Sequence, residues 1–370
     1  MSRQVSRTAG AAARSSASIA VLVFVVVVAA APAAAQQPEQ PAPIPAPAPA
    51  PASSVAPAFD RARFDEFLAG VRTEALSRGI SAVTVVNALT NLDPVPQVLE
   101  RDRQQAEFTL NLSEYLTRRL TPAIVKTART HLRAHRALTA RVAKAYGVDP
   151  RMQIAVWGLE SNFGRFSGVR PSVPTLATLA FDDRRSGLFR GELFDALTIV
   201  DQGDVPPDQL RGSWAGALGQ AQFLPSSYLS WAVDFDGDKR RDIWGSLPDV
   251  LASIANYLHG HGWKAGVAWG YHVTVPASAS AALTAVPLRT SGCRAVRELS
   301  EPRTLKQWRS LGLVAARGSA LPSSALAASL LRIDDRAWLV TGNYEAILAY
   351  NCAHTYALSV VSLADRLGHP

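Results

Sequence analysis

A proline-rich stretch near the N-terminus limits where this 370-residue chain can fold. Residues 37–57 read QPEQPAPIPAPAPAPASSVAP and contain no aromatic side chain. Alternating proline and alanine favours an extended, semi-rigid backbone with little apolar surface to bury. We therefore predict a linker at residues 36–58 and one folded domain at residues 59–367.

The residues before the linker have the pattern of a secretory signal peptide. Three arginines precede an apolar run at residues 19–31, and small residues follow it. This order predicts a signal peptide at residues 1–35, cleaved after Ala35, and hence export. The alternative is an uncleaved membrane anchor, because residues 17–35 are just long enough to span a bilayer if Pro32 is tolerated within the helix.

The charge of the chain is compatible with several classes of anionic partner. The net charge is +8, and it falls to +5 when the three arginines of the signal peptide are removed. Such an excess does not choose among nucleic acid, phospholipid and an acidic cell-wall polymer. The sequence has no block of Lys and Arg and no basic stripe interleaved with aromatic residues, so nucleic acid is not an expected partner.

Helical periodicity dominates the predicted domain. Apolar residues recur at steps of three and four between residues 60 and 146. Asp149 and Pro150 form a helix-start pair, which predicts a helix that continues to Gly164. Residues 271–288 are rich in β-branched residues broken by Pro and Ser, which indicates a small sheet or irregular subdomain. Further helices are predicted at residues 248–258 and 356–367.

Two cysteines, Cys293 and Cys352, are the only ones in the sequence. An even count in an exported protein favours a disulfide, which would stabilise the fold by ~4 kcal/mol by restricting the unfolded chain. The alternative is a pair of buried free thiols.

Glu160 is the strongest candidate for chemistry. It would lie in the last turn of the predicted helix, where the helix dipole disfavours another negative charge. Trp157, Leu159 and Phe163 make its surroundings apolar. Both effects raise the pKa of a carboxyl group toward the value that a general acid needs. The alternative is an ordinary solvated glutamate at a helix end.

A second stretch supplies the kind of surface that a sugar chain needs. Residues 213–228 read SWAGALGQAQFLPSSY. Their glycines allow the backbone to approach a ligand closely, while Ser, Gln and Tyr offer neutral hydrogen-bonding groups. This composition favours a neutral, polar ligand.

These features together resemble a known family, the lytic murein transglycosylase B family, which is glycoside hydrolase family 103. The resemblance covers most of the chain from about residue 60 onward, in family order. It implies a mainly α-helical fold with a lysozyme-like, SLT-like catalytic core, a helical N-terminal portion and a small mixed α/β subdomain at about residues 270–335. The stretches that carry it are AVWGLESNFGR, DDRRSGLFRGEL, SWAGALGQAQFLPSSY, DFDGDKRRDIWGSLPDVLASIANYLHGHGW and AYNCAHTYALSV.

The resemblance also implies an activity and a location. Members cleave the β-1,4 bond between N-acetylmuramic acid and N-acetylglucosamine without water and leave a 1,6-anhydro end. Glu160 occupies the family's catalytic position as the single acid and base. The location expected from the signal peptide is the periplasm, with inner-membrane anchoring as the alternative. The partners that the resemblance implies are peptidoglycan glycan strands and stem peptides, with other cell-wall enzymes as further candidates.

The same resemblance assigns substrate-binding positions. Arg184 and Arg185 match residues that approach the stem peptide, where a guanidinium group suits a carboxylate. The alternatives are a solvated charge pair for these two and ordinary core or surface residues for the others. The positions that would line the glycan groove are Ser213, Gln222, Tyr257, Tyr350, Asn351 and Tyr356.

An acidic loop is the candidate metal site. Asp234, Asp236 and Asp238 stand at positions 1, 3 and 5 of a calcium-loop pattern, and Arg240 offers a backbone carbonyl at position 7. The glycine and glutamate of a standard loop are absent, and the family resemblance supplies Asp249 as the closing ligand. We expect no cofactor for catalysis, and the metal ion that this loop would hold is a structural Ca²⁺.

Three alternatives to a transglycosylase follow from the same residues. A muramidase would use water to cleave the same bond. A scaffold protein would keep the groove and bind peptidoglycan without cleaving it, and a calcium-regulated module would bind a partner only with the ion present.

Overall fold

The computed structural model describes residues 59–104, 111–316 and 321–368. The predicted signal peptide and the whole of the predicted linker lie outside the described residues. The described residues belong to one compact unit, Phe59–Pro370. Its helices are α1 (Arg61–Ser77), α2 (Ala82–Leu89), α3 (Gln97–Gln104), α4 (Leu112–Arg119), α5 (Pro122–Ala134), α6 (Arg136–Tyr146), α7 (Pro150–Ser161), α8 (Ser172–Phe181), α9 (Ser186–Asp201), α10 (Pro225–Trp231), α11 (Leu247–Gly260), α12 (Ser280–Thr284), α13 (Arg294–Arg297), α14 (Leu305–Ser310), α15 (Gly342–Tyr350) and α16 (His354–Arg366).

Local capping explains where many of these helices begin. Ser81, Asn111 and Thr121 each accept a hydrogen bond from a backbone N–H in the first turn of the helix that follows. Asp149 does the same for α7, and Pro150 occupies its first turn, as the sequence predicts. The helix predicted around residues 248–258 is α11, and the last predicted helix is α16.

The helix α7 lies in the middle of the main hydrophobic core. It packs against α5, α6, α11 and α16. Most of its residues are buried, including the polar Gln153, whose Nε2 donates to two backbone carbonyls. A helix enclosed on so many sides has a fixed position, so whatever its C-terminal end carries is also fixed.

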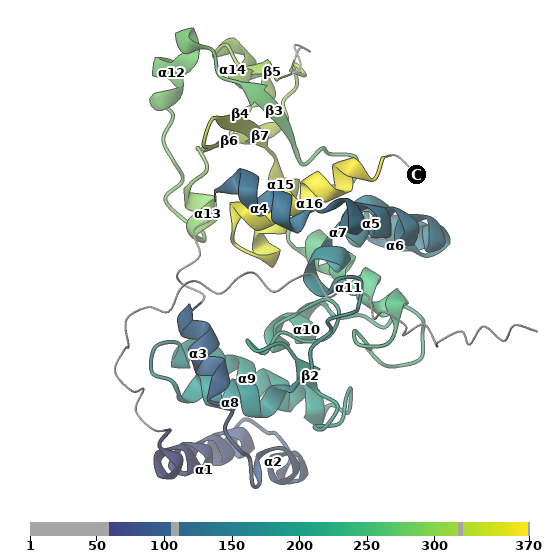
Figure 1. Ribbon diagram of the computed structural model, residues 1–370, viewed down its shortest axis with the longest axis vertical. Helices are drawn as coiled ribbons and strands as arrows, with labels where there is room; N and C mark the ends of the chain where they lie inside the picture. Colours follow the sequence, from purple (N-terminus) through teal and green to yellow (C-terminus); the bar gives the residue numbers. More distant parts are fainter. Residues whose placement is uncertain (1–58, 105–110, 317–320, 369–370) are drawn as a thin grey trace, which may run out of the picture. The chain divides into compact units, whose positions relative to one another are not determined.

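The mixed subdomain is built on a small antiparallel sheet (Figure 1). The sheet has five strands in the order β4-β6-β7-β3-β5. The subdomain has a hydrophobic cluster separate from the main core, in which Trp308 of α14 is buried with Leu305 and Leu339. The sheet continues to Val340, five residues beyond the predicted end of the subdomain. The strands are β3 (Gly270–Thr274), β4 (Arg303–Thr304), β5 (Val314–Ala315), β6 (Ala327–Ile333) and β7 (Arg336–Val340), and a separate pair is β1 (Arg170–Pro171) with β2 (Arg211–Gly212).

Cys293 and Cys352 form a disulfide with a Cα–Cα distance of 6.3 Å. The bond joins the start of α13 to the segment between α15 and α16. It therefore ties a loop after the first strand of the sheet to the helical core.

Within the described ranges, no single helix is long and apolar enough to cross a membrane. The bent pair α15 and α16 meets the criteria only when the two helices are taken together, by length and composition.

Candidate active site

Glu160 is the second-last residue of α7. The residue is half-buried, and its carboxyl group is enclosed by neighbouring side chains. Loss of hydration raises the pKa of this carboxyl group to about 7, against the opposing effects of the Tyr356 hydroxyl and the Arg119 charge. Such a group both gives and takes a proton near neutral pH.

The chain turns sharply after Glu160. The backbone φ angles of Asn162, Phe163 and Gly164 are 49°, 59° and 81°, so three residues in a row are left-handed. This corrects the helix end predicted at Gly164, because α7 stops at Ser161 and a left-handed residue cannot continue it. The Ser161 hydroxyl accepts a hydrogen bond from the Gly164 N–H at 3.1 Å and holds the turn.

Gln220 connects this turn to the glycine-rich stretch predicted as a ligand surface. Its Oε1 accepts from Trp157 Nε1 at 2.8 Å, and its Nε2 donates to the Trp244 carbonyl at 2.7 Å. A Cβ atom at Gly164 would lie 2.3 Å from the Gln220 Oε1. The glycine therefore leaves room for the contact that joins the two segments.

Three tyrosines form a wall beside Glu160, and we call Tyr257, Tyr350 and Tyr356 the tyrosine wall. The ring centroids of Tyr257 and Tyr350 are 4.7 Å apart, and those of Tyr350 and Tyr356 are 6.4 Å apart. The Tyr257 and Tyr350 hydroxyls donate to the backbone carbonyls of Ala349 and Ala221. Burial first, and then the charge of Glu160, raises the pKa of both Tyr350 and Tyr356 well above its usual value. The wall is therefore neutral.

The other predicted groove residues have mainly local contacts. The Ser213 hydroxyl accepts from the Ala217 N–H at 3.1 Å, and Gln222 Nε2 donates to the Gly219 carbonyl at 2.8 Å. Asn351 caps the end of α15 and is exposed.

The two arginines predicted to approach the stem peptide stand at the start of α9. Arg184 Nε lies 3.4 Å from Asp182 Oδ1, and the Arg185 guanidinium lies over the Phe189 ring at 5.8 Å. Glu160 thus lies near enough to Tyr350 and Tyr356 for its charge to raise their pKa, whereas these arginines belong to a different element.

Arg119 is a member of the site that sequence reasoning missed. It ends α4, and its Nη2 donates to the carbonyl of Leu159 at the end of α7. A cation at this place offsets the negative end of the helix dipole beside Glu160. Its partner is a main-chain carbonyl 40 positions away, so no residue pattern indicates the contact.

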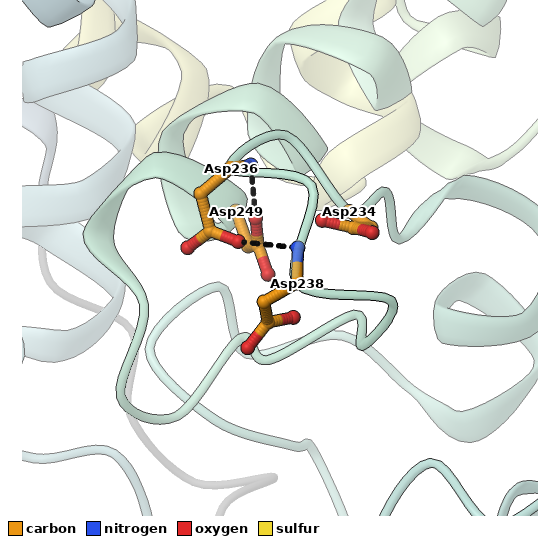
Figure 2. A group of neighbouring side chains, drawn as sticks. All are labelled: Asp234, Asp236, Asp238 and Asp249. Carbon is orange, nitrogen blue, oxygen red and sulfur yellow. Dashed lines mark hydrogen bonds between the residues drawn. The ribbon is translucent and has the colours of Figure 1, made fainter.

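The acidic loop brings four carboxylates together (Figure 2). One oxygen from each of Asp234, Asp236, Asp238 and Asp249 lies within 4.8 Å of the others. Asp249 is in the first turn of α11 and is fully buried, while the other three are exposed. The closing ligand implied by the family resemblance therefore lies beside the three loop residues.

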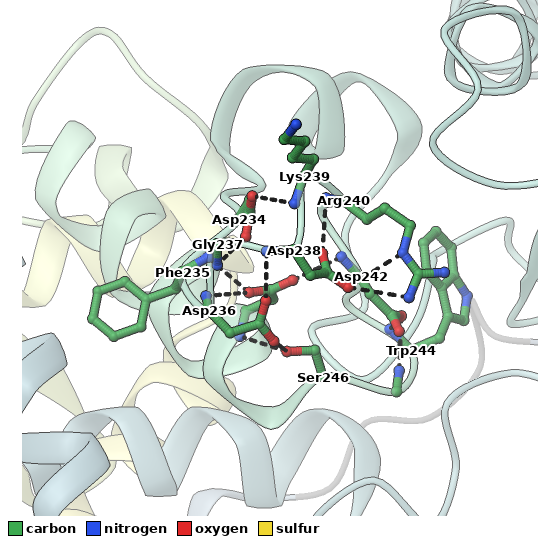
Figure 3. Close-up of polar contacts among 12 residues, drawn as sticks. Asp234, Phe235, Asp236, Gly237, Asp238, Lys239, Arg240, Asp242, Trp244 and Ser246 are labelled. Atoms are coloured by element: carbon green, nitrogen blue, oxygen red, sulfur yellow. Dashed lines mark hydrogen bonds and ion pairs between the residues drawn. The ribbon is translucent and has the colours of Figure 1, made fainter.

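Backbone N–H groups fix these carboxylates in place (Figure 3). Asp249 Oδ1 accepts from Phe235 N at 2.7 Å and Asp249 Oδ2 from Asp242 N at 2.9 Å. Asp234 Oδ2 accepts from Lys239 N at 2.8 Å. Burial raises the pKa of Asp249 above its usual value, against the opposing effect of its own hydrogen bonds from Phe235 and Asp242.

The donor set of the loop fits a hard divalent cation. Four carboxylates held close together supply the oxygen ligands that Ca²⁺ prefers, and without a cation they repel one another. Lys239 takes the left-handed conformation that a standard loop gives to glycine, with φ of 71°. The Arg240 side chain pairs with Asp238 at 3.1 Å and removes part of the local negative charge.

A carboxyl group with a raised pKa, set at the end of a buried helix beside a neutral aromatic wall, is the arrangement expected of an enzyme that acts on glycosidic bonds. Comparison with known sequences makes this more specific. The family model of the transglycosylase SLT domain matches residues 63–365, and the chain belongs to this family.

Sequence comparison gives one curated relative, the membrane-bound lytic murein transglycosylase B of Escherichia coli (strain K12). It is 32% identical over 262 residues, which are 68% of this chain and 66% of the relative. The matched region thus spans just under two thirds of the relative's own length.

Solved structures share the fold. SltB3 from Pseudomonas aeruginosa, in complex with NAG-anhNAM-pentapeptide, is 40% identical with a TM-score of 0.74, over 82% of this chain and 79% of that chain. Slt35 from Escherichia coli, in complex with calcium, is 27% identical with a TM-score of 0.67, over 82% of this chain and 92% of that chain. The mainly helical fold with a small antiparallel sheet is therefore that of Slt35.

Proposed function

We propose that this protein cleaves the β-1,4 bond between N-acetylmuramic acid and N-acetylglucosamine in peptidoglycan and forms a 1,6-anhydro end. The observation that carries the proposal is the Glu160 carboxyl group, whose pKa is raised to about 7 and which faces the Tyr356 hydroxyl. The complex of SltB3 with NAG-anhNAM-pentapeptide supports the same substrate and product chemistry.

One carboxyl group suffices for this reaction. Protonated Glu160 gives its proton to the glycosidic oxygen as the bond to C1 of the muramoyl residue breaks. The carboxylate then takes the proton of the C6 hydroxyl, whose oxygen forms a new bond to C1, so the enzyme ends as it began and no water is consumed. Ordinary glycosidases need a second carboxylate for water or for a covalent intermediate. Among the described groups that shift the pKa of Glu160, none is a second carboxylate.

The groove residues hold the substrate in this proposal. The tyrosine wall offers flat faces to the sugar rings, and Ser213, Gln222 and Asn351 offer neutral hydrogen-bonding groups. Arg184 and Arg185 pair with carboxylates of the stem peptide. The complex of SltB3 with NAG-NAM-pentapeptide supports a site that accepts both the glycan and its stem peptide.

Glu160→Gln tests whether the protein is an enzyme or a scaffold. We expect the release of soluble fragments from sacculi to fall at least ~10²-fold while binding to sacculi remains, because the amide keeps the shape but its N–H protons are far too weakly acidic to transfer. Unchanged behaviour in both assays would favour a scaffold instead.

Thermal unfolding shows whether the Glu160→Gln variant is folded before its activity is measured. The native pKa of Glu160 lies above its unfolded value, so the native protein binds this proton more tightly and becomes less stable as pH rises from about 4.5 to about 7. The amide does not ionise, so the variant does not lose stability in this way as pH rises. Above pH 7 the variant should therefore unfold at a temperature no lower than that of the unmodified protein.

The acidic loop binds Ca²⁺ in this proposal, as a structural ion. Asp234, Asp236, Asp238 and Asp249 would hold it, with the backbone carbonyl of Arg240 as a further ligand. The calcium complex of Slt35 and the four clustered carboxylates support this assignment. The ion would neutralise the loop and fix the start of α11.

The protein works outside the inner membrane in this proposal. The signal-peptide pattern of residues 1–35 and the homology to a membrane-bound murein transglycosylase support a place in the cell envelope. We propose the periplasm after cleavage at Ala35, with the linker at residues 36–58 as a tether if the anchor is retained.

A further inference from the structure

A cavity of about 1060 Å³ lies apart from Glu160, between the sheet of the subdomain and the helical core. It meets α7 at Arg151, nine residues before Glu160, which is ~13 Å along the helix. Within the described part of the chain, its lining includes neither Glu160 nor the tyrosine wall. It is therefore a second concave site.

Aromatic side chains from the sheet form one side of this cavity. His272 of β3 and Trp338 of β7 are directly paired in the sheet, and their rings stack at 5.4 Å with an angle of 24°. The Arg336 guanidinium lies 5.9 Å from the Trp338 ring centroid. Side chains alternate along a strand, so Ala337 and Leu339 enter the subdomain core while Arg336 and Trp338 point to the other face.

The segment between α11 and β3 forms another side, and Trp263 and Trp269 belong to it. Three of the eight tryptophans of the chain thus line one cavity. Trp263 Nε1 donates to the Gly147 carbonyl at 3.1 Å, and Trp269 Nε1 donates to Asp365 Oδ2 at 3.3 Å. The Nε1–H group of each indole is therefore hydrogen-bonded, which fixes the orientation of both rings.

This segment is fixed by the helix that follows the sheet. The buried Asn343 side chain accepts from Lys264 N at 2.7 Å and donates to the carbonyls of Lys264 and Val267. The Thr341 hydroxyl donates to the Ala268 carbonyl at 2.7 Å. The cavity is therefore preformed, as ligand sites usually are.

The charges around the cavity balance. Its acidic groups are Asp149 and Asp365, and its guanidinium groups are Arg151 and Arg336. Asp149 and Arg151 also pair with each other at 2.6 Å. A balanced lining gives no preference for a charged stem peptide or an anionic lipid, whereas carboxylates and guanidiniums beside aromatic faces bind hydroxyl and amide groups of a neutral sugar.

We propose that this cavity is a second binding site for the neutral N-acetylglucosamine units of a peptidoglycan strand and holds the strand away from the cleavage site. The inference rests on the proposed function, because that function supplies a polymer long enough to reach both places. Two contacts on one insoluble polymer raise the effective concentration of the second contact. The cavity should therefore matter for sacculi and not for a substrate of a few sugars.

The test compares Arg336→Ala with Arg332→Ala. Both arginines belong to the β6–β7 hairpin, but Arg332 is exposed and does not line the cavity. We expect Arg336→Ala and Trp269→Ala to lower the rate on sacculi by at least about threefold and to leave the rate on a soluble tetrasaccharide of the same glycan unchanged. Arg332→Ala should match the unmodified protein on both substrates, and Trp269→Phe should retain most of the sacculus rate.

The outcomes separate the inference from the proposed function. Equal rates on sacculi for Arg336→Ala and Arg332→Ala, or a parallel loss on both substrates, would overturn the second site. If the unmodified protein cleaves neither substrate, the proposed function fails, and binding of peptide-free glycan strands to the Glu160→Gln protein decides the inference alone. Weaker binding on adding Arg336→Ala supports the site, and unchanged binding refutes it.

Discussion

At the scale of single residues, Glu160 is surrounded by groups that act on its pKa in opposite directions. Burial raises the pKa, while the Tyr356 hydroxyl and the Arg119 charge lower it. The resulting pKa is about 7, so near neutral pH the protonated and the ionised forms of Glu160 are both populated. A group that serves in both roles within one turnover needs this balance.

The alkaline limb of the pH profile tests this environment. The first step needs protonated Glu160, so kcat/KM should fall as pH rises through an apparent pKa of about 7. Initial rates with a soluble glycan between pH 5 and pH 9 measure it. A flat profile across this range would show that Glu160 does not supply the proton.

Arg119→Gln should move that limb upward. Its cation lowers the pKa of Glu160, so removing the charge raises the pKa and extends activity to higher pH. Arg118→Gln is a matched control, because Arg118 is the neighbouring exposed arginine of α4. The same limb in both variants would mean that Arg119 acts only on the structure of the helix end.

The residue scale also shows what local sequence can reveal. The prediction for Glu160 rests on its own neighbours, because the helix start at Asp149 and the apolar residues around Glu160 are all local signals. Arg119 is not found, because it acts on the carbonyl of Leu159, and any residue offers a carbonyl. The identity of a main-chain partner leaves no trace in the sequence.

At the scale of elements, the end of α7 determines where Glu160 points. The starts of helices follow from side-chain caps such as Asp149, which the sequence displays. The turn after the end does not, because Phe163, next to the left-handed cap Asn162, takes a left-handed conformation that its type disfavours. Tertiary contacts enforce it, with the Phe163 ring stacked on His131 at 4.9 Å and edge-on to Trp157 at 5.5 Å.

Gly164→Ala tests the turn after α7. The substitution puts a side chain on a left-handed residue and against the Gln220 amide, so we expect a loss of about 1–3 kcal/mol in unfolding free energy and a lower kcat. Thermal unfolding and initial rates measure the two effects. Gly187→Ala is the control, because nothing lies within 4 Å of its added Cβ atom. Equal behaviour of the two variants would contradict the account of this turn.

The acidic loop makes a prediction for calcium. Adding Ca²⁺ to chelator-treated protein should raise the unfolding temperature, because an ion that binds only the native state stabilises it. Asp238→Asn should reduce the shift by removing one of four clustered charges. Mg²⁺ is the control cation. It requires a nearly ideal octahedral arrangement of ligands, so we expect this loop to bind it less well than Ca²⁺. No shift with Ca²⁺ would contradict the assignment.

At the scale of the whole described unit, two separate hydrophobic clusters stabilise the fold. The main cluster encloses α7 and the tyrosine wall, and the smaller one lies under the sheet of the subdomain. The sequence predicts the helical part and the presence of a subdomain. It does not predict the strand order, because β4 pairs with β6 across an intervening helix and strand, and such pairing depends on long-range packing.

Digestion of sacculi in water enriched in heavy oxygen tests the central claim most directly. Mass spectrometry of the released fragments should show ends lighter by one water than reducing ends, with no heavy oxygen incorporated, because the C6 hydroxyl and not water attacks C1. Reducing ends that carry heavy oxygen would contradict the account and show that the protein is a hydrolytic muramidase.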